Sequence, residues 1–210
     1  MHDSIPLRRR LGWWAHALLS MARRGQRFSP DPHDQANYAR LWQLGLAMRA
    51  EADQAPVEVT EEVYREAVSL VGPIPVADAA VFNSHGQLLL IQRADDGLWA
   101  MPGGALDVGE TAAEGACREA WEETGLRVRA TALIGVYDSR FCGTRSSWHL
   151  YQFVFLCEPV EGELTPSHET PDVRWFDPDA LPPLSPGHPR RVADAIAFYR
   201  RERPQVYFDQ

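Results

Sequence analysis

The stretch from Gly104 to Leu126 constrains this chain more than any other part of its sequence. Thr111 and Glu114 have the spacing of a capping box, in which two side chains satisfy backbone amides at a helix start. A helix is therefore expected to begin there and to end at Gly125, a residue that adopts positive φ at little cost. Just upstream, the bend at Pro102-Gly103-Gly104 lacks Cβ atoms at two positions, so a ligand can approach the backbone closely.

Three glutamates, Glu119, Glu122 and Glu123, fall in the last two turns of this predicted helix and share one face. They repel one another, and the negative end of the helix dipole disfavours them further, each conflict costing a few tenths to about 1 kcal/mol. A divalent cation reverses both effects. Mg²⁺ or Mn²⁺ prefers such oxygen ligands and shares its coordination with phosphate oxygens. These residues therefore predict a metal site that can hold a diphosphate.

The alternative is that these glutamates form only a solvated helix face. The upstream glycines, with Glu110 and Arg118 in register, favour the metal site over that interpretation. Arg118 is expected to have a structural role, pairing with Glu110 to tie the preceding loop to the helix, rather than touching substrate.

The pattern G-x5-E-x7-R-E-A-W-E-E-T-G-L resembles the Nudix box, with Ala120 smaller than the usual aliphatic residue. The resemblance implies the Nudix αβα sandwich, an α/β fold with a mixed sheet between helices. It also implies Mg²⁺- or Mn²⁺-dependent hydrolysis of the pyrophosphate of a nucleoside diphosphate linked to a group X, giving a nucleoside monophosphate and phospho-X. By this resemblance Glu119, Glu122 and Glu123 hold the metal, and Glu122 and Glu123 serve catalysis.

Further site residues are predicted outside the box. Glu169 lies in a loop before Trp175-Phe176, where Nudix enzymes often carry an extra metal ligand or general base, so either Glu169 or a box glutamate is the base. Arg93 at a strand end and the glycines Gly103 and Gly104 are predicted to contact substrate. Aromatic rings that stack on a base contribute about 1–3 kcal/mol. The candidates are Phe28 and Tyr38, with Tyr137 and Trp148 as alternatives, and lesser contacts are considered at Arg140, Arg145 and His168.

Residues 1–72 are predicted to form a small all-helical N-terminal domain, and residues 73–210 the Nudix domain. The boundary is placed at the Val71 to Pro75 stretch, whose prolines stop a helix. Gly25 to Tyr38 is similar to the N-terminal domain of a Nudix subgroup that includes ADP-ribose and CDP-choline pyrophosphatases. The expected helices are Leu7 to Arg24, Asp34 to Ala50, Glu61 to Leu70 behind the N-cap Thr60, and Arg190 to Arg201. The expected strands are Val76 to Phe82 and Gln87 to Arg93, paired as a hairpin, then Arg127 to Val136, Trp148 to Glu158 and Val173 to Phe176.

The composition favours a cytoplasmic protein without a membrane or nucleic-acid partner. A basic segment precedes the apolar Leu11 to Ala22, but the absence of a cleavage site favours an amphipathic helix over a secretion signal, with interfacial binding as the minor alternative. A net charge of −8 repels nucleic-acid backbones on average. The three cysteines lack disulfide or metal-finger spacing. Exposed-looking tryptophans, Trp13, Trp14 and Trp42, predict that the helical domain forms a homodimer rather than only burying one face of the Nudix domain. The resemblance implies that it also completes the substrate site as a lid.

The sequence leaves the base and X open. ADP-ribose and CDP-choline are the favoured substrates. The alternatives are a pyrophosphohydrolase of nucleoside di- or triphosphates, including oxidised nucleotides, the removal of an RNA 5′ pyrophosphate, and a non-catalytic nucleotide-sensing regulator. The complete carboxylate set and the absence of a basic recognition helix disfavour the regulator.

Overall fold

The computed structural model describes residues 6–67, 73–145, 149–167 and 169–210. Its contacts divide the chain into two compact units: Met1–Val71 with the short segment Asp107–Gly109, and Gly72–Leu106 with Glu110–Gln210. We call them the helical unit and the sheet unit. The predicted boundary stretch begins at residues 71 and 72, which lie outside the described ranges. The division into domains at 72/73 therefore stays a prediction.

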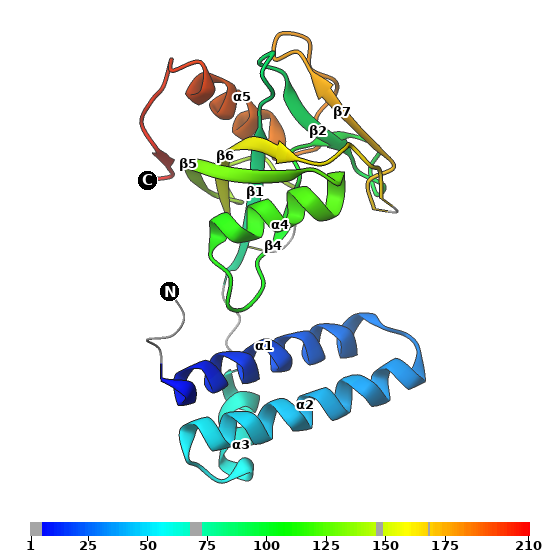
Figure 1. The fold of residues 1–210 in the computed structure, drawn as a ribbon, viewed down its shortest axis with the longest axis vertical. Coiled ribbons are helices and arrows are strands. Elements are labelled where there is room, and N and C mark those ends of the chain that lie inside the picture. The colour runs from blue at the N-terminus through cyan, green and yellow to red at the C-terminus, as the bar shows by residue number, and fades with distance from the viewer. Residues whose placement is uncertain (1–5, 68–72, 146–148, 168) are drawn as a thin grey trace. The chain divides into compact units, whose positions relative to one another are not determined.

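The helical unit consists of α1 (Leu7–Phe28), α2 (Pro32–Asp53) and α3 (Val57–Ala67) (Figure 1). Small residues let α1 and α2 pack closely: a Cβ on Gly45 would lie 2.8 Å from Cγ of Leu19. Asp31 caps α2, accepting a 2.7 Å hydrogen bond from the amide of His33. The predicted N-cap role of Thr60 is wrong, because α3 begins earlier and the Thr60 hydroxyl instead donates to the carbonyl of Pro56 one turn back.

The sheet unit contains a five-stranded sheet in the order β4-β1-β6-β5-β8 and a three-stranded sheet in the order β3-β2-β7. β1 pairs with β6 in parallel and with β4 in antiparallel orientation, so the larger sheet is mixed. The strands are β1 (Ile74–Val81), β2 (Leu88–Gln92), β3 (Trp99–Ala100), β4 (Gly103–Ala105), β5 (Arg127–Asp138), β6 (Leu150–Glu161), β7 (Asp172–Phe176) and β8 (Tyr207–Phe208).

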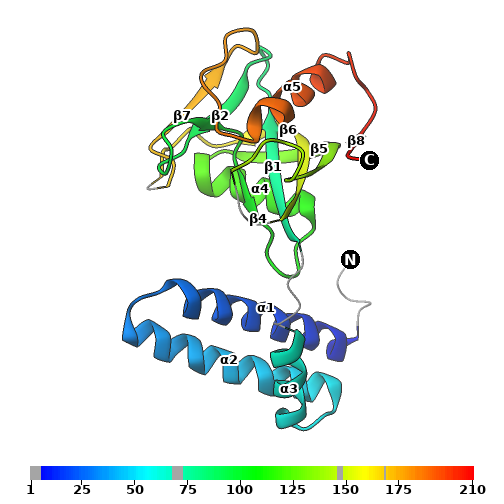
Figure 2. The same cartoon turned by 180° about the vertical axis from the view of Figure 1, so that it is seen from behind.

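Two helices cover opposite faces of the larger sheet, α4 (Ala112–Thr124) and α5 (His188–Tyr199) (Figure 2). On one face Ala116 and Ala120 of α4 pack on the buried Ala77 and Ala79 of β1. On the other face α5 packs against residues of β1 and β6 that include Ala80 and Val154. The αβα arrangement and the mixed sheet are confirmed, and the small Ala120, fully buried, lets α4 lie close to the sheet.

The predicted hairpin of the first two strands is wrong. β1 and β2 belong to different sheets, and between them the described residues make only one antiparallel bridge, Phe82 to Leu88. The turn itself forms as expected, since Oδ1 of Asn83 accepts hydrogen bonds from the amides of His85 and Gln87. The strands diverge after it because each finds a longer partner elsewhere, β6 for β1 and β7 for β2.

The closing helix begins at His188 rather than at the predicted Arg190. Gly187 precedes it with φ of 94°, and a proline in the first turn suits a helix start because its missing amide has no partner there in any case. No described helix is both long and apolar enough to cross a membrane. All three cysteines are free, Cys142 and Cys157 being buried and Cys117 partly exposed. A hydrogen bond with the Cys157 thiol lowers the pKa of Cys117 to about 6.

Candidate active site

The helix that carries the glutamates is fixed at both ends. At its start the capping box is complete: Oγ1 of Thr111 accepts from the Glu114 amide at 3.2 Å, and Oε2 of Glu114 accepts from the Thr111 amide at 2.8 Å. At its end Gly125 adopts φ of 74°. A Cβ there would lie 2.7 Å from the carbonyl oxygen of Glu163, so glycine is required by space as well as by conformation.

Arg118 connects the loop before α4 to the glutamates on it. Its guanidinium donates to both carboxylate oxygens of Glu110, at 2.8 and 3.0 Å, and to the carbonyl of Ala105 at 3.1 Å. The remaining nitrogen donates to Glu119 at 2.9 Å and to Glu122 at 3.0 Å. Glu110 first, and then Glu119, raise the pKa of Arg118 further above its usual value. Arg118 thus positions carboxylates on both sides of itself.

The two glycines of β4 bring backbone against the glutamates. A Cβ on Gly104 would lie 2.5 Å from Oε1 of Glu119, and a Cβ on Gly103 would lie 2.5 Å from the carbonyl oxygen of Ala77 and from Oδ1 of Asp78. The amide of Gly103 donates a 2.8 Å hydrogen bond to Oε2 of Glu123. Side chains at either position would therefore separate β4 from α4 or from β1.

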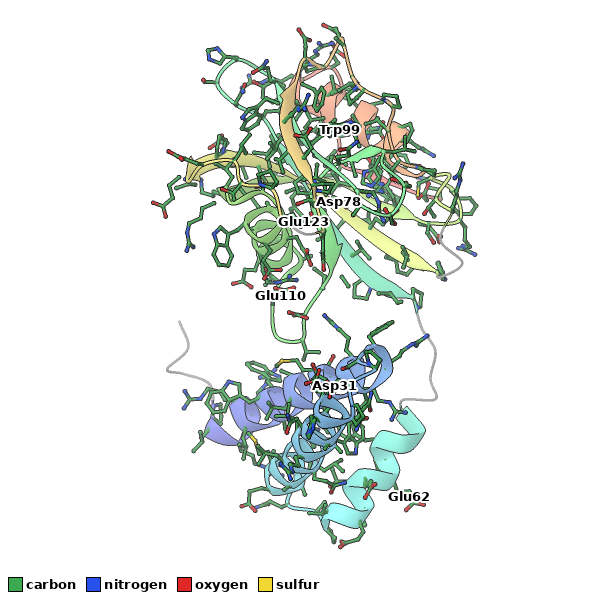
Figure 3. All side chains as sticks on the ribbon, turned by 90° about the vertical axis from the view of Figure 1, so that its right-hand side faces the viewer. Asp31, Glu62, Asp78, Trp99, Glu110 and Glu123 are labelled. Atoms are coloured by element: carbon green, nitrogen blue, oxygen red, sulfur yellow. The ribbon has the colours of Figure 1, made fainter. Side chains whose placement is uncertain are left out.

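Glu123 lies in the last turn of α4 and is labelled in Figure 3. Burial first, and then Glu119 and Glu169, raise its pKa to about 8, against the opposing effects of the Gly103 hydrogen bond and Arg93. Burial likewise raises the pKa of Glu119, against the opposing effect of Arg118. Carboxyl groups this close and this shielded from water favour either protons or a bound cation.

These residues line one pocket of the sheet unit, with a volume of about 930 Å³. Its lining includes three glutamates from two elements, Glu119 and Glu123 on α4 and Glu169 on the loop before β7. Glu122 does not line this pocket and is held by Arg118 instead. Of the described side chains, no group of three acidic, histidine or cysteine residues is already arranged around one metal position.

The loop that carries Glu169 is tied to α4 and to the smaller sheet. The Thr170 hydroxyl donates a 2.7 Å hydrogen bond to the carbonyl of Glu123, and the Glu169 carbonyl accepts from the amide of Ala94 at 3.2 Å. The Glu169 amide donates to the hydroxyl of Ser167 at 3.2 Å. His168 lies outside the described residues. Glu169 thus occupies a defined place opposite the box glutamates.

The residues present fit a divalent cation. Oxygen ligands are the preference of Mg²⁺ and Mn²⁺. The raised pKa values of Glu119 and Glu123 mark carboxyl groups that are buried close together, where a bound cation would favour their charged form. Arg118 pairs with Glu119 and Glu122, so a cation would compete with it for these two carboxylates.

Arg93 lies in the same pocket but is already paired. Its guanidinium donates to both carboxylate oxygens of Asp95, at 2.9 and 2.7 Å, and this pairing raises its pKa. Its charge acts on both Glu123 and His188. Arg145, a lesser candidate, also lines the pocket, whereas Arg140 is paired with Asp138 at 2.6 Å.

The aromatic candidates are not gathered at the pocket lining. Tyr137 is fully buried, stacks on Tyr207 at 4.8 Å and donates to Asp194, so it fills the core and cannot stack on a base. Phe28 and Tyr38 belong to the helical unit. Phe28 is 72% exposed, and Tyr38 packs over Gly25, where a Cβ would lie 2.2 Å from its ring. Trp148 lies outside the described residues.

One wall of the pocket is polar and was not predicted from the sequence. Asp78 of β1 and Arg191 of α5 form a buried ion pair, and His188, 6% exposed, stands one turn before Arg191. Nearby, the Ser185 hydroxyl donates to Asp96 at 2.7 Å. One sequence signal was available, since Asp78 interrupts an otherwise apolar strand segment. An unpaired carboxylate is costly at such a position.

Residues 72–195 match the family model described as NUDIX domain. The chain belongs to the Nudix family. Its matched region contains α4, the two β4 glycines and the Glu169 loop.

Similar proteins extend the comparison beyond this domain. The putative ADP-ribose pyrophosphatase YjhB of Bacillus subtilis (strain 168) is 30% identical over 200 residues, which cover 93% of this chain and 95% of that protein. A structure described as UDP-X diphosphatase has a TM-score of 0.63 and 26% identity, covering 92% of this chain and 95% of its own. An ADP-ribose pyrophosphatase from Streptococcus suis 89-1591 has a TM-score of 0.58 and 31% identity, covering 66% and 100%. The chain is thus a Nudix hydrolase of the pyrophosphatase type.

Proposed function

We propose that this Nudix hydrolase cleaves the pyrophosphate bond of a nucleoside diphosphate linked to X, with Mg²⁺ or Mn²⁺, to give a nucleoside monophosphate and phospho-X. The observation that carries the proposal is the convergence of Glu119, Glu123 and Glu169 on one pocket that also contains Arg93. Nudix family members generally use divalent metal ions. A metal bound here would supply charge neutralisation of the diphosphate and a more acidic water.

The residues of this chain have separable parts in that reaction. Glu119 and Glu123 would hold the metal, joined by Glu122 once its carboxylate leaves Arg118. Arg93 would orient the diphosphate, since it lines the same pocket and its charge acts on Glu123. The general base is Glu169 or a box glutamate. Glu169 lies on a loop apart from α4. It can therefore accept a proton from water while the α4 glutamates hold the metal.

The experiment that tests the proposal is an assay of purified protein with Mg²⁺ and with Mn²⁺, against ADP-ribose, CDP-choline, UDP-sugars and nucleoside triphosphates. Metal-dependent release of a nucleoside monophosphate supports it. Glu122→Gln and Glu123→Gln should each lower kcat by at least about 100-fold, as removal of a proton-transfer group or metal ligand does. Glu58→Gln on exposed α3 is the matched control. A folded Glu123→Gln protein with full turnover would exclude this site as the catalytic one.

The identity of the base and of X is the finer part of the proposal. The resemblance to the subgroup favours ADP-ribose or CDP-choline, and the relatives named ADP-ribose pyrophosphatase support the first of these. The structural neighbour described as UDP-X diphosphatase adds UDP-linked groups. Comparing kcat/KM among these substrates decides between them, and preferential triphosphate hydrolysis would favour the alternative activity instead.

We further propose that the helical unit forms a homodimer. Leu7, Trp14, Met21 and Phe28 stand seven residues apart on α1 and are 62%, 51%, 54% and 72% exposed. Such spacing places them along one face of a helix, the pattern of a helix–helix seam. Sedimentation of wild type and of Trp14→Glu with Met21→Glu tests this, since the double variant should be monomeric. A role of this unit as a lid, substrate contacts at Phe28 and Tyr38, and a cytoplasmic location remain predictions.

A further inference from the structure

We propose that His188 and Arg191, in the first turn of α5, are specificity-determining residues that donate hydrogen bonds to an uncharged oxygen acceptor of the substrate. That acceptor is a carbonyl of the base or a hydroxyl of a sugar, and not a phosphate oxygen. The inference rests on the proposed function and deepens it, because it concerns the part of the substrate beyond the diphosphate.

His188 is a buried donor with one nitrogen left for a ligand. The side chain is only 6% exposed, yet it lines the pocket. Its Nδ1 accepts a 3.4 Å hydrogen bond from the amide of Met101, so the ring proton must be on Nε2. Within the described part of the chain Nε2 has no hydrogen-bond partner, and it is not sealed from the pocket. A buried donor of this kind is costly unless something accepts from it.

His188 is also uncharged at neutral pH. Burial, with Arg93 acting in the same direction, lowers its pKa to about 4. The imidazole therefore offers a single neutral N–H rather than a positive charge. A neutral N–H can donate to any oxygen, but a buried phosphate charge also needs a cation beside it, which this imidazole does not supply. A carbonyl or hydroxyl oxygen needs none.

Arg191 completes a pair of donors without adding net charge. Its Nε donates to the carbonyl of Gly187 at 2.9 Å, and Nη1 donates to Oδ2 of Asp78. Nη2 has no partner among the described residues and is not sealed off either. Because Asp78 balances the guanidinium, this pair carries no net charge. Arg93 is balanced by Asp95 in the same way, so a diphosphate would depend on a metal at the glutamates for its charge balance.

The shared pocket sets which part of the substrate reaches the pair. Arg93, Glu123 and His188 line the same pocket, and the charge of Arg93 acts on both of the others. With the diphosphate held at the acidic cluster and Arg93, the group bonded to one phosphate extends to His188. Apolar residues of the same pocket, Val76, Met101 and Leu150, can contact the faces of a ring there.

The test uses reaction products, which bind without turnover. Isothermal titration compares AMP and UMP, which carry base and ribose, with ribose 5-phosphate and glucose 1-phosphate, which stand for phospho-X, and with inorganic phosphate. His188→Phe keeps the ring and removes the donor. His188→Gln restores an N–H donor, and His85→Phe on an exposed turn is the matched control. Thermal unfolding of each variant checks that it folds.

We expect His188→Phe to weaken binding of one product class about tenfold, the effect of one hydrogen bond left unmade. His188→Gln should recover most of that loss, and inorganic phosphate should bind all variants alike. Weaker nucleotide binding identifies base or ribose as the acceptor, and weaker sugar-phosphate binding identifies X. Unchanged binding of both classes in folded His188→Phe, or an equal loss for inorganic phosphate, overturns the inference.

The outcome is separable from that of the proposed function. Product binding needs no hydrolysis, so a protein that cleaves no nucleoside diphosphate linked to X can still show the His188 effect. If hydrolysis does occur, His188→Phe should raise KM more than it lowers kcat, because the contact is made in the bound substrate as well as in the transition state. Hydrolysis with no change in either constant would leave the proposed function intact and remove His188 from the site.

Discussion

The amide of Gly103 donates a 2.8 Å hydrogen bond to Oε2 of Glu123, joining the edge strand β4 to the last turn of α4. This contact holds the carboxylate in the pocket where burial and two neighbouring glutamates disfavour its charge. The Gly103 amide therefore holds the Glu123 carboxylate in a position where its charge is destabilising. Such an arrangement is typical of groups retained for function rather than stability.

Replacing Glu123 with Gln should therefore stabilise the metal-free protein at alkaline pH. The folded pKa of Glu123 is about 8, above the ordinary value of 4.5, so its contribution to stability is full below about 4.5 and is lost as pH rises through 8. Thermal unfolding in EDTA should show a higher midpoint for Glu123→Gln than for wild type at pH 8.5 and little difference at pH 5. Equal unfolding midpoints of the two proteins at both pH values would show that the charge on Glu123 does not destabilise the fold.

Mg²⁺ should reverse the order of the two unfolding midpoints. Mg²⁺ binding to the folded state raises the unfolding midpoint of wild type by mass action, and Glu123→Gln should gain much less. Because the cation displaces the proton on Glu123, binding near pH 7.5 should release protons, which titrations in buffers of different ionisation enthalpy measure. Proton release that persists undiminished in Glu123→Gln would assign it to another group.

The two glycines of β4 should respond differently to an added methyl group. In Gly104→Ala the new Cβ meets the far end of the Glu119 side chain, which can move, so activity should fall at least about tenfold while stability changes little. In Gly103→Ala it meets backbone of Ala77 and Asp78, so the protein should lose about 2 kcal/mol or more of stability. Urea unfolding and kcat/KM measured on both variants separate these effects. Gly12→Ala, with ordinary contacts only, is the control.

Arg118 should be sensitive even to a conservative change. Lysine keeps the charge but cannot donate in parallel to both oxygens of Glu110 while reaching Glu119. Because the pair is partly exposed, Arg118→Lys should cost only about 1–2 kcal/mol of stability, with a larger loss of activity through the displaced carboxylates. Glu110→Gln should lose comparable stability. If the activity of Arg118→Lys falls only as much as its stability explains, the role of Arg118 is confined to fixing the loop before α4.

The features that the sequence predicted correctly are those encoded by neighbouring residues. Thr111 with Glu114 and the terminal Gly125 define α4 locally, and the spacing of the glutamates follows from the helix. The turn at Asn83 was local too, and it formed. Its two strands separate because the choice of partner depends on segments far along the chain. Strands of two or three residues, such as β3 and β4, are too short to show alternation.

The polar wall of the pocket shows more clearly what could not be predicted from the sequence. Asp78 and Arg191 are 113 residues apart and meet only when α5 packs on the larger sheet. Taken alone, Asp78 is an unexpected carboxylate in a strand, and Arg191 is one of several arginines in the predicted closing helix. Likewise Glu122 has the helical spacing of its neighbours, yet its side chain lies with Arg118, because side-chain partners are not fixed by helical periodicity.

The Asp78–Arg191 pair gives the final prediction. Breaking a buried ion pair from one side leaves an uncompensated charge and costs about 3–5 kcal/mol, whereas replacing both partners with neutral groups of similar size is nearly neutral. Asp78→Asn and Arg191→Met should each destabilise strongly in urea unfolding, and the double variant should recover most of the loss. The single changes also leave the wall of the pocket charged, so product binding should suffer in them even where the protein folds. If the two losses simply add in the double variant, the side chains act independently, and the neutral wall beside His188 must then be explained by other groups.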